Sequence, residues 1–292
     1  MSASQSRDAA PILVIGATGH TGRHVVSGLT QLGRPVRAAT RGAHVPDSTA
    51  EPVRFDWAEP SSYDAALAGV ERMYVMAPDL VADPLVLMQP FLERAWERGV
   101  RRVVLLGASS SPEGAPGLGL VHRLLSERSP EWAVLQPSSF MQNFVNERHP
   151  HGAGLKNDGL LVTATGDGRV GFVDARDIAE VAVRALADET SHNTAHLVTG
   201  PQALRYDDIV AVITEVAGRP MRHVKATPKE ARRHLTTLGI PDRSARILVR
   251  LDEAIQQGAE NRVTDTVARV TRHEPRTFEA FAKEHADFWR AA

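Results

Sequence analysis

Three glycines at regular spacing, Gly16, Gly19 and Gly22, are the residues with the clearest chemistry. They follow an apolar, β-branched run at 12–15 and precede a segment whose apolar residues recur at helical spacing. In such a loop the first glycine permits a tight turn, the second lets the backbone approach a pyrophosphate, and the third lets the helix pack on the strand. The N–H groups at the helix start then face the phosphates. We therefore predict a dinucleotide-binding loop made of Gly16, Ala17, Thr18, Gly19, His20, Thr21 and Gly22.

The choice between cofactors depends on the end of the next predicted strand, 36–40. A site for NAD usually carries an acidic residue there, which binds the ribose hydroxyls. This chain has Thr40 and Arg41 instead, and Arg37 lies nearby. A guanidinium pairs with a 2′-phosphate, whereas an acid would repel it, so we expect NADP(H). The alternative is that Arg37 and Arg41 are solvated surface residues.

Other candidates follow from the rule that ligands bind outside the carboxyl ends of parallel strands. The residues directly after each predicted strand should therefore form one rim. Asp56 has two interpretations there, a hydrogen bond to an adenine amino group or a turn at the strand end. Besides the glycine loop, the candidates for cofactor binding are Thr40, Arg41, Asp56, Trp57, Met76, Ala77, Pro78, Gly107, Ala108 and Pro137. The candidates for substrate binding are the apolar residues Phe140, Met141 and Phe144.

Residues that could move a proton are few. Short-chain reductases often carry a tyrosine and a lysine four residues apart, but none of Tyr63, Tyr74 and Tyr206 is followed by lysine at that spacing. His122, near the start of a predicted short helix, has a pKa range suited to proton relay, although an exposed or helix-terminal histidine is the more common explanation of such a residue. Ser109 follows the fifth predicted strand. His122 and Ser109 are the catalytic candidates.

Composition excludes several classes of function. The 292 residues include 34 Lys and Arg against 35 Asp and Glu, so nothing in the charge balance indicates nucleic acid or an anionic membrane as a partner. The absence of cysteine excludes disulfides, thiolate metal sites and thiol catalysis. The pair His149 and His151 lacks a third ligand, so we predict no metal site. We expect a small-molecule substrate, and the oligomeric state stays open.

Targeting signals are also missing from the pattern. Residues 1–10 lack the apolar core of a signal peptide. No run reaches the roughly 18 apolar residues that a membrane helix needs. We therefore expect a cytoplasmic protein.

The elements that must position these residues alternate between strands and helices. Strands are expected at 12–15, 36–40, 53–55, 73–76, 103–106 and 132–135, with helices between most of them. Such alternation predicts an α/β fold, a doubly wound parallel sheet with helices on both faces.

After Pro137 the regular alternation of strands and helices ends. Residues 149–159 are expected to form a loop, residues 174–187 and 206–217 form helices, and helices dominate from Pro228 onward. We predict a cofactor domain at 1–150, onto which 171–200 packs back, and a smaller mixed α/β domain for the substrate at 151–292.

Several segments resemble the NmrA-like atypical short-chain dehydrogenase/reductase family, and they lie at 16–23, 38–41, 135–144, 171–179 and 197–201. Within it, 119–122 and 275–278 are similar to the branch of the ergot alkaloid iminium reductases and NAD(P)H quinone reductases. The resemblance implies an extended Rossmann domain that binds NADP(H) and a small C-terminal substrate domain. Gln136 departs from the arginine that usually precedes Pro137, and the lysine base of the isoflavone-reductase-like branch has no counterpart.

A cofactor loop without an acid–base pair leaves two functions open. Hydride transfer to an iminium ion or a quinone needs little or no enzymatic proton donor, because the cofactor carries the chemistry. The leading prediction is an NADPH-dependent oxidoreductase of a small aromatic or heterocyclic electrophile, as in secondary metabolism. The alternative is a non-catalytic NADP(H)-binding redox sensor or regulatory protein.

Overall fold

A computed structural model describes residues 10–42, 49–78, 81 and 83–290. The chain divides into two compact units. The first is Met1–Gln136 with Ile178–His196, and the second is Pro137–Asp177 with Leu197–Ala292. The expected roles, a cofactor domain at 1–150 and a substrate domain at 151–292, stay predictions.

A seven-stranded sheet organises the first unit, in the order β3-β2-β1-β4-β5-β6-β9. The pairings from β3 through β6 are parallel. The strand order reverses beside β1, which lies between β2 and β4, and such a switch point is where open α/β sheets bind ligands. The strands are β1 Ile12–Ile15, β2 Val36–Thr40, β3 Glu51–Arg54, β4 Arg72–Met76, β5 Arg102–Leu106, β6 Glu131–Pro137 and β9 Thr194–Val198.

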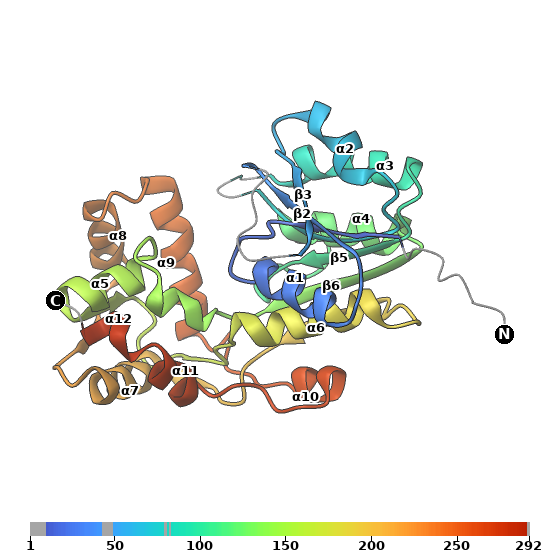
Figure 1. Cartoon of the computed structure of the whole chain (residues 1–292). Helices are drawn as coiled ribbons and strands as arrows, with labels where there is room; N and C mark the ends of the chain where they lie inside the picture. Colours follow the sequence, from blue (N-terminus) through green and yellow to red (C-terminus); the bar gives the residue numbers. More distant parts are fainter. Residues whose placement is uncertain (1–9, 43–48, 79–80, 82, 291–292) are drawn as a thin grey trace. The chain divides into compact units, whose positions relative to one another are not determined.

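Helices cover both faces of this sheet, as the α/β prediction requires. Figure 1 shows α2, α3 and α4 on one face and α1 and α6 on the other. Alternate residues of β1, Leu13 and Ile15, share a buried cluster with Phe91 of α3. On the opposite face α1 lies against α6, since a Cβ on Gly28 would come within 2.8 Å of Val183. The helical elements are α1 Gly22–Gln31, η1 Pro60–Ser62, α2 Tyr63–Leu67, α3 Leu85–Glu97, α4 Leu118–Arg128 and α6 Ala175–Ala187.

A buried arginine fixes the end of α6. The Arg102 side chain is 1% exposed and lies 2.6 Å from the Glu131 carboxylate. It also donates to the carbonyls of Asp188 at 2.6 Å and Glu189 at 3.1 Å. Carbonyls at a helix C-terminus have no partner within the helix and carry its negative dipole end, so a guanidinium there is stabilising. The sequence pattern did not predict this anchor, because its carbonyl partners lie more than 80 residues away.

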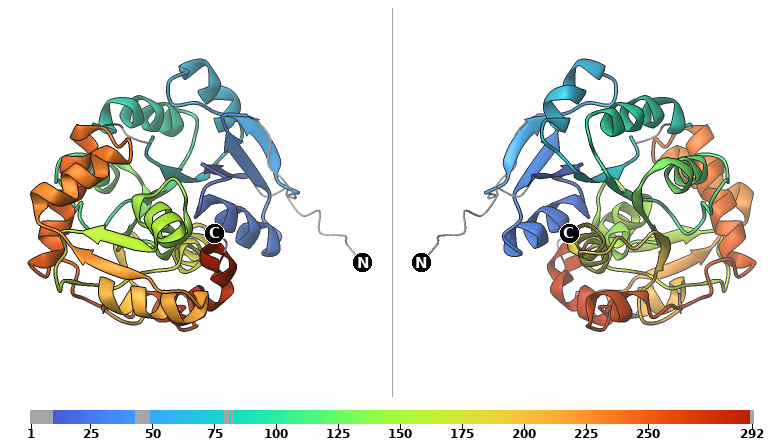
Figure 2. Two further views of the ribbon diagram at one scale, coloured as in Figure 1. Left: turned by 90° about the vertical axis from the view of Figure 1, so that its left-hand side faces the viewer. Right: turned by 90° about the vertical axis from the view of Figure 1, so that its right-hand side faces the viewer.

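The second unit combines small sheets with helices. Strand β7 pairs in parallel with β11, and Figure 2 shows the two side by side in green and orange, while β8 pairs antiparallel with β10. Its main core includes Phe144, Phe172, Tyr206, Phe278 and Trp289. The strands are β7 Leu160–Thr163, β8 Arg169–Val170, β10 Leu204–Arg205 and β11 Arg222–Lys225. The helical elements are η2 Met141–Val145, α5 Pro150–Asp158, α7 Tyr206–Ala217, α8 Pro228–Thr237, α9 Asp242–Gln256, α10 Thr266–Thr271, α11 Phe278–Glu284 and α12 Ala286–Arg290.

The loop expected at 149–159 is wrong, because α5 occupies most of it. Pro150 takes the first helical position, and the Nδ1 atom of His149 accepts the N–H of His151 at 3.3 Å. The glycines that suggested a loop serve close packing instead: a Cβ on Gly152 would lie 2.4 Å from the Asn146 carbonyl.

Within 10–42, 49–78, 81 and 83–290, no three or more His, Cys, Asp or Glu side chains are placed to hold a metal ion. No helix in that part of the chain has the length and apolarity to cross a membrane.

Candidate functional site

The glycine loop makes a tight turn and a close helix–strand contact. Gly16 has a φ of +73°, which favours glycine, and a Cβ there would lie 2.2 Å from the Met76 sulfur. A Cβ on Gly22 would lie 2.1 Å from the Gly16 carbonyl oxygen. Between them the N–H of Gly19 donates to that same oxygen at 2.9 Å. A side chain at Gly22 would therefore push α1 away from the end of β1, and one at Gly16 would collide with the Met76 side chain of β4.

A buried hydrogen bond holds the loop to the neighbouring strand. The hydroxyls of Thr21 and Tyr74 lie 2.8 Å apart, and both side chains are buried. Burial raises the pKa of Tyr74 despite this hydrogen bond, so the phenol stays neutral. The hydroxyl of Thr21, one of the predicted cofactor residues, thus links the start of α1 to β4.

A cavity of about 440 Å³ opens beside this loop, within the size range of small-molecule and cofactor sites. It lies where β1, β2 and β4 end, at the strand-order reversal. Its lining is Ile15, Gly16, Thr18, Gly19, Ala39, Thr40, Arg41, Phe55, Asp56, Trp57, Ala58, Met76, Ala77, Pro78, Val81 and Leu87. Ten predicted cofactor residues are thus brought together: Gly16, Thr18, Gly19, Thr40, Arg41, Asp56, Trp57, Met76, Ala77 and Pro78.

The other predicted cofactor residues do not line this cavity. They are Ala17, His20, Thr21, Gly22, Gly107, Ala108 and Pro137. Ala17 is fully buried, and His20 is exposed. Gly107 donates its N–H to the Leu135 carbonyl at 2.7 Å, so it joins β5 to β6. Pro137 belongs to the second unit. Cofactor binding by these residues stays a prediction.

The two arginines near the end of β2 differ in their partners. Arg37 lies in register with Glu51 on β3, and its guanidinium contacts that carboxylate at 3.0 Å. Arg37 is therefore already paired. Arg41 is exposed, lines the cavity, and has no ion pair with the residues that the structure describes. Arg41 is the arginine whose charge a ligand phosphate could meet.

Thr40 adds a second polar group beside Arg41. Its Oγ1 atom is buried and lacks a hydrogen-bond partner among the described residues. Leaving a buried hydroxyl unpaired costs about 1–3 kcal/mol, so an acceptor entering the cavity would be favoured at this point. Together Thr40 and Arg41 offer a hydroxyl and a cation to a ligand.

The part of the cavity lining that follows β3 is aromatic and held in place. Trp57 packs edge-on against Phe55, with ring centres 5.0 Å apart, and against Phe91 at 5.2 Å. The Tyr63 hydroxyl donates to the Trp57 carbonyl at 2.9 Å. Asp56 accepts the N–H of Ala58 at 2.9 Å, which is the turn predicted as one of its two interpretations. A contact from Asp56 to adenine stays a prediction.

His122 lies in a core environment. Its side chain is 4% exposed, and its Nε2 atom lies 4.0 Å from a Glu113 oxygen. The ring contacts Trp132, the second residue of β6, at 5.6 Å between centres. Neither ring nitrogen has a hydrogen-bond partner among the described residues. Burial lowers the pKa of His122 more than Glu113 raises it, so the ring is neutral near pH 7. A catalytic role of His122 stays a prediction.

The serine-rich loop after β5 is tied to β6. The Gln136 side chain donates to the Ser111 carbonyl at 3.3 Å. Gln136, which departs from the family's usual arginine, thus positions this loop. Ser109 is half-buried in it, and its catalytic role stays a prediction.

The three predicted substrate residues lie in the second unit and differ in exposure. Met141 and Phe144 are buried in its core, where the ring of Phe144 lies 5.2 Å from that of Phe172. Phe140 is half-buried and forms an isolated β-bridge with Val173. Contact of these residues with a substrate stays a prediction, and Phe140 is the one with accessible surface.

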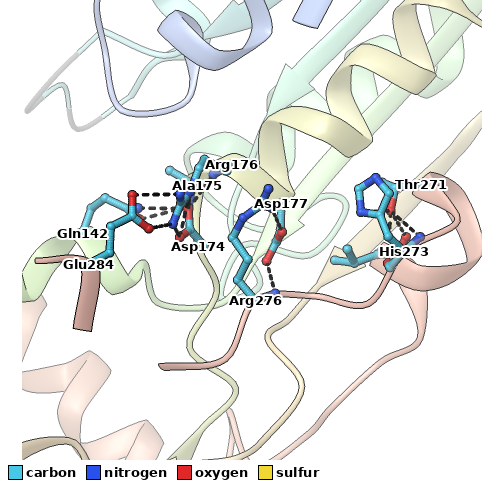
Figure 3. Close-up of polar contacts among 10 residues, drawn as sticks. Gln142, Asp174, Ala175, Arg176, Asp177, Thr271, His273, Arg276 and Glu284 are labelled. Carbon is cyan, nitrogen blue, oxygen red and sulfur yellow. Dashed lines mark hydrogen bonds and ion pairs between the residues drawn. The ribbon is translucent and has the colours of Figure 1, made fainter. Parts of the chain in front are cut away.

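Two buried acids begin α6 and anchor the C-terminal segment (Figure 3). Asp174 accepts the N–H of Arg176 at 2.8 Å, and Arg176 also binds Glu284 at 2.8 Å. Asp177 accepts the N–H of Arg276 at 2.8 Å and pairs with its guanidinium. Burial raises the pKa of Asp177 to about 6, against the lowering effect of Arg276. Asp174 caps the helix, Asp177 lies in its first turn, and together they connect α6 to the segment that leads into α11.

Comparison with known proteins identifies the family. Residues 8–108 match the sequence profile of the NmrA-like family. An uncharacterized oxidoreductase of Bacillus subtilis (strain 168), YesF, is 44% identical over 281 residues, covering 96% of each chain. The chain belongs to the NmrA-like family. The resemblance predicted from its motifs is therefore confirmed.

Another relative and a solved structure agree with the assignment of the chain to the NmrA-like family. Agroclavine dehydrogenase of Claviceps fusiformis is 32% identical, covering 95% of this chain and 98% of that protein. The structure of an NADPH-dependent quinone oxidoreductase from Escherichia coli, complexed with NADPH, superposes with a TM-score of 0.81 at 18% identity. That match covers 94% of this chain and 99% of the other and shows a common fold. The chain is an oxidoreductase with an NAD(P)-binding domain of Rossmann type.

Proposed function

We propose that this NmrA-like protein is an NADPH-dependent reductase of a small aromatic or heterocyclic electrophile, such as a quinone or an iminium ion. The observation that carries the proposal is Arg41, an exposed arginine without an acidic partner among the described residues, in the lining of the cavity beside the glycine loop. An acid would occupy the end of β2 in a site for NAD. The quinone oxidoreductase and the dehydrogenase named above support the reaction class.

The residues of the cavity fit a dinucleotide phosphate. The backbone of Gly16 and Gly19 would hold the pyrophosphate at the start of α1. Arg41 and the unpaired Thr40 hydroxyl would hold the 2′-phosphate. When bound, the nicotinamide ring supplies a hydride. Trp57 and its aromatic neighbours would exclude water from the wall of the site.

The contacts of the tyrosines in the first unit favour an electrophile whose reduction needs no proton from a tyrosine of the enzyme. Tyr74 is bound to Thr21, and Tyr63 donates to the Trp57 carbonyl. Both phenols therefore make structural hydrogen bonds, and we assign neither of them as the proton donor. An iminium ion needs no added proton on hydride transfer, and a quinone yields an anion that is readily protonated.

Turnover separates this proposal from a regulatory NADP(H)-binding protein. The purified protein is mixed with NADPH and a panel of quinones and cyclic iminium ions, and loss of NADPH absorbance is followed with product analysis. A reductase oxidises NADPH in step with reduced product. Binding of NADPH without turnover on any member of the panel would refute the proposal and support the sensor.

A further inference from the structure

The Met76 side chain covers the first glycine of the cofactor loop. Met76 is the last residue of β4, and it packs on the buried core of the first unit while also lining the cavity beside the loop. A Cβ on Gly16 would lie 2.2 Å from the Sδ atom of Met76, 3.1 Å from its Cγ atom and 3.7 Å from its Cε atom. The thioether therefore occupies the space that a side chain at position 16 would need, at the turn out of β1.

The other methionines that the structure describes lie in different surroundings. Met73, Met88 and Met141 are buried. Met221 is half-buried, as Met76 is, but it packs against the core of the second unit. Among the methionines in 10–42, 49–78, 81 and 83–290, Met76 alone belongs to the lining of the cavity beside the glycine loop. A reagent that enters this cavity therefore meets one thioether.

A thioether in the lining of an open cavity is open to oxidation. Peroxides convert methionine to its sulfoxide, and exposure of the sulfur favours the reaction. The chain contains no cysteine, so no thiol competes for the oxidant. Hydrogen peroxide transfers one oxygen to Sδ: the O–O bond breaks, an S–O bond forms, the sulfur gives up two electrons, and the second oxygen leaves as water.

The added oxygen would disturb the site in either of two orientations. Toward Gly16 it has no room, because the sulfur already fills the space beside that backbone. Toward the cavity it places a partly negative hydrogen-bond acceptor beside the glycine loop. The proposed function puts the pyrophosphate there, and phosphate oxygens are themselves negative, so the two groups would repel. Both orientations therefore oppose binding of the dinucleotide.

We propose that Met76 is a site of oxidation by hydrogen peroxide, that its sulfoxide weakens the binding of NADPH, and that bound cofactor protects it. The place of the phosphates rests on the proposed function. The same function supplies an oxidant, because a hydroquinone product reacts with O2 to return the quinone and hydrogen peroxide, two electrons and two protons passing to the oxygen. Oxidation of Met76 would thus lower cofactor binding where the product is reoxidised.

The test compares the wild type with Met76→Leu and with Met221→Leu as the matched control. Leucine has nearly the volume of methionine but no sulfur to oxidise. Each purified protein is treated with hydrogen peroxide, with and without saturating NADP⁺. Catalase then removes the excess peroxide, and peptide mass spectrometry locates the added oxygen. Calorimetric titration gives the Kd of NADPH before and after treatment, so that each protein is its own reference.

Peroxide should change the wild type at one residue and in one property. We expect an added oxygen on Met76 and a rise of at least about 10-fold in the Kd of NADPH, and saturating NADP⁺ should suppress both. Methionine sulfoxide reductases that act on the two sulfoxide epimers should restore the original Kd. The ratio of the treated to the untreated Kd should stay within about twofold in M76L and should equal the wild-type ratio in M221L.

Three results would overturn the proposal: oxidised Met76 with a Kd within about twofold of the untreated value, an equal loss of affinity in M76L, or oxidation of Met221 while Met76 stays reduced. If M76L does not fold, the wild type alone decides, through the mapped sulfoxide, the change in Kd and its restoration by the reductases. These are binding measurements. A protein that binds NADPH but reduces no acceptor would refute the proposed function and leave the modification site in place.

Discussion

Replacement of Arg41 by alanine should weaken the binding of NADPH and spare that of NADH. Arg41 is exposed and has no ion pair with the described residues, so no internal contact is lost on truncation. A hydrogen bond between charged groups contributes about 1.5–3 kcal/mol, and solvent exposure favours the lower end of this range. Since 1.4 kcal/mol is tenfold, the Kd of NADPH should rise about 10–30-fold.

The same reasoning predicts a larger effect for Arg41→Asp, because a carboxylate would repel the 2′-phosphate. NADH lacks that phosphate, and its Kd should change less than about 3-fold in both variants. The preference of the wild type for NADPH should also shrink as salt is added, since exposed charges are screened.

Fluorescence or calorimetric titration measures these constants. Arg101→Ala is the matched control, because Arg101 is another exposed arginine of the first unit and lies outside the cavity lining. If Arg41→Ala left the Kd of NADPH within about twofold of the wild type, or weakened NADPH and NADH equally, the assignment of Arg41 to the phosphate would be refuted.

Three further predictions concern stability and are measured by denaturant titration. Arg102→Met should lower the free energy of unfolding by about 3–5 kcal/mol, because it leaves Glu131 and buried carbonyls without their partner. The control Arg101→Ala should lower it by less than about 0.5 kcal/mol. A similar loss in both variants would contradict the role of Arg102 in fixing the end of α6. Gly22→Ala should destabilise the protein far more than Gly42→Ala, because a Cβ meets the Gly16 carbonyl at the first position and nothing within 4 Å at the second; equal stability of the two variants would contradict the close packing. The pKa of Asp177 is raised from an ordinary value of 3.8 to about 6, so the native state binds the extra proton and Asp177 contributes stability below pH 4 that is lost as pH rises through about 6. The wild type should therefore lose stability relative to Asp177→Asn across that interval, and parallel pH profiles would argue against it.

The order of elements was predictable from local signals. Apolar runs that end near glycine or proline located β1, β4 and β5 to within a residue, and alternation with helices predicted the doubly wound sheet. Helix α5 was not predicted, because the close packing of Gly152 against the Asn146 carbonyl is seen only in the structure. A glycine that permits close approach and one that marks a loop are identical in a sequence.

The site was predictable where it depends on strand ends and unpredictable where it depends on partners. The rule that ligands bind outside the carboxyl ends of parallel strands predicted that Thr40, Arg41 and Trp57 lie near one another, and all three line one cavity. That Arg37 is paired and Arg41 is not depends on the register of β2 against β3. The burial of His122 likewise follows from packing against Trp132, which no spacing signals. The cytoplasmic location stays a prediction.

Transfer of deuterium from nicotinamide-labelled NADPH to a quinone or iminium product tests the central claim most directly. The protein is incubated with NADPH carrying deuterium at the transferable position, and the product is examined by mass spectrometry and NMR. For an iminium ion, we expect deuterium on the reduced carbon and a slower reaction than with unlabelled NADPH. For a quinone, whose reduced oxygen exchanges with water, the slower reaction is the expected sign. NADPH that binds tightly but transfers no deuterium and shows no isotope effect on any acceptor would contradict a reductase.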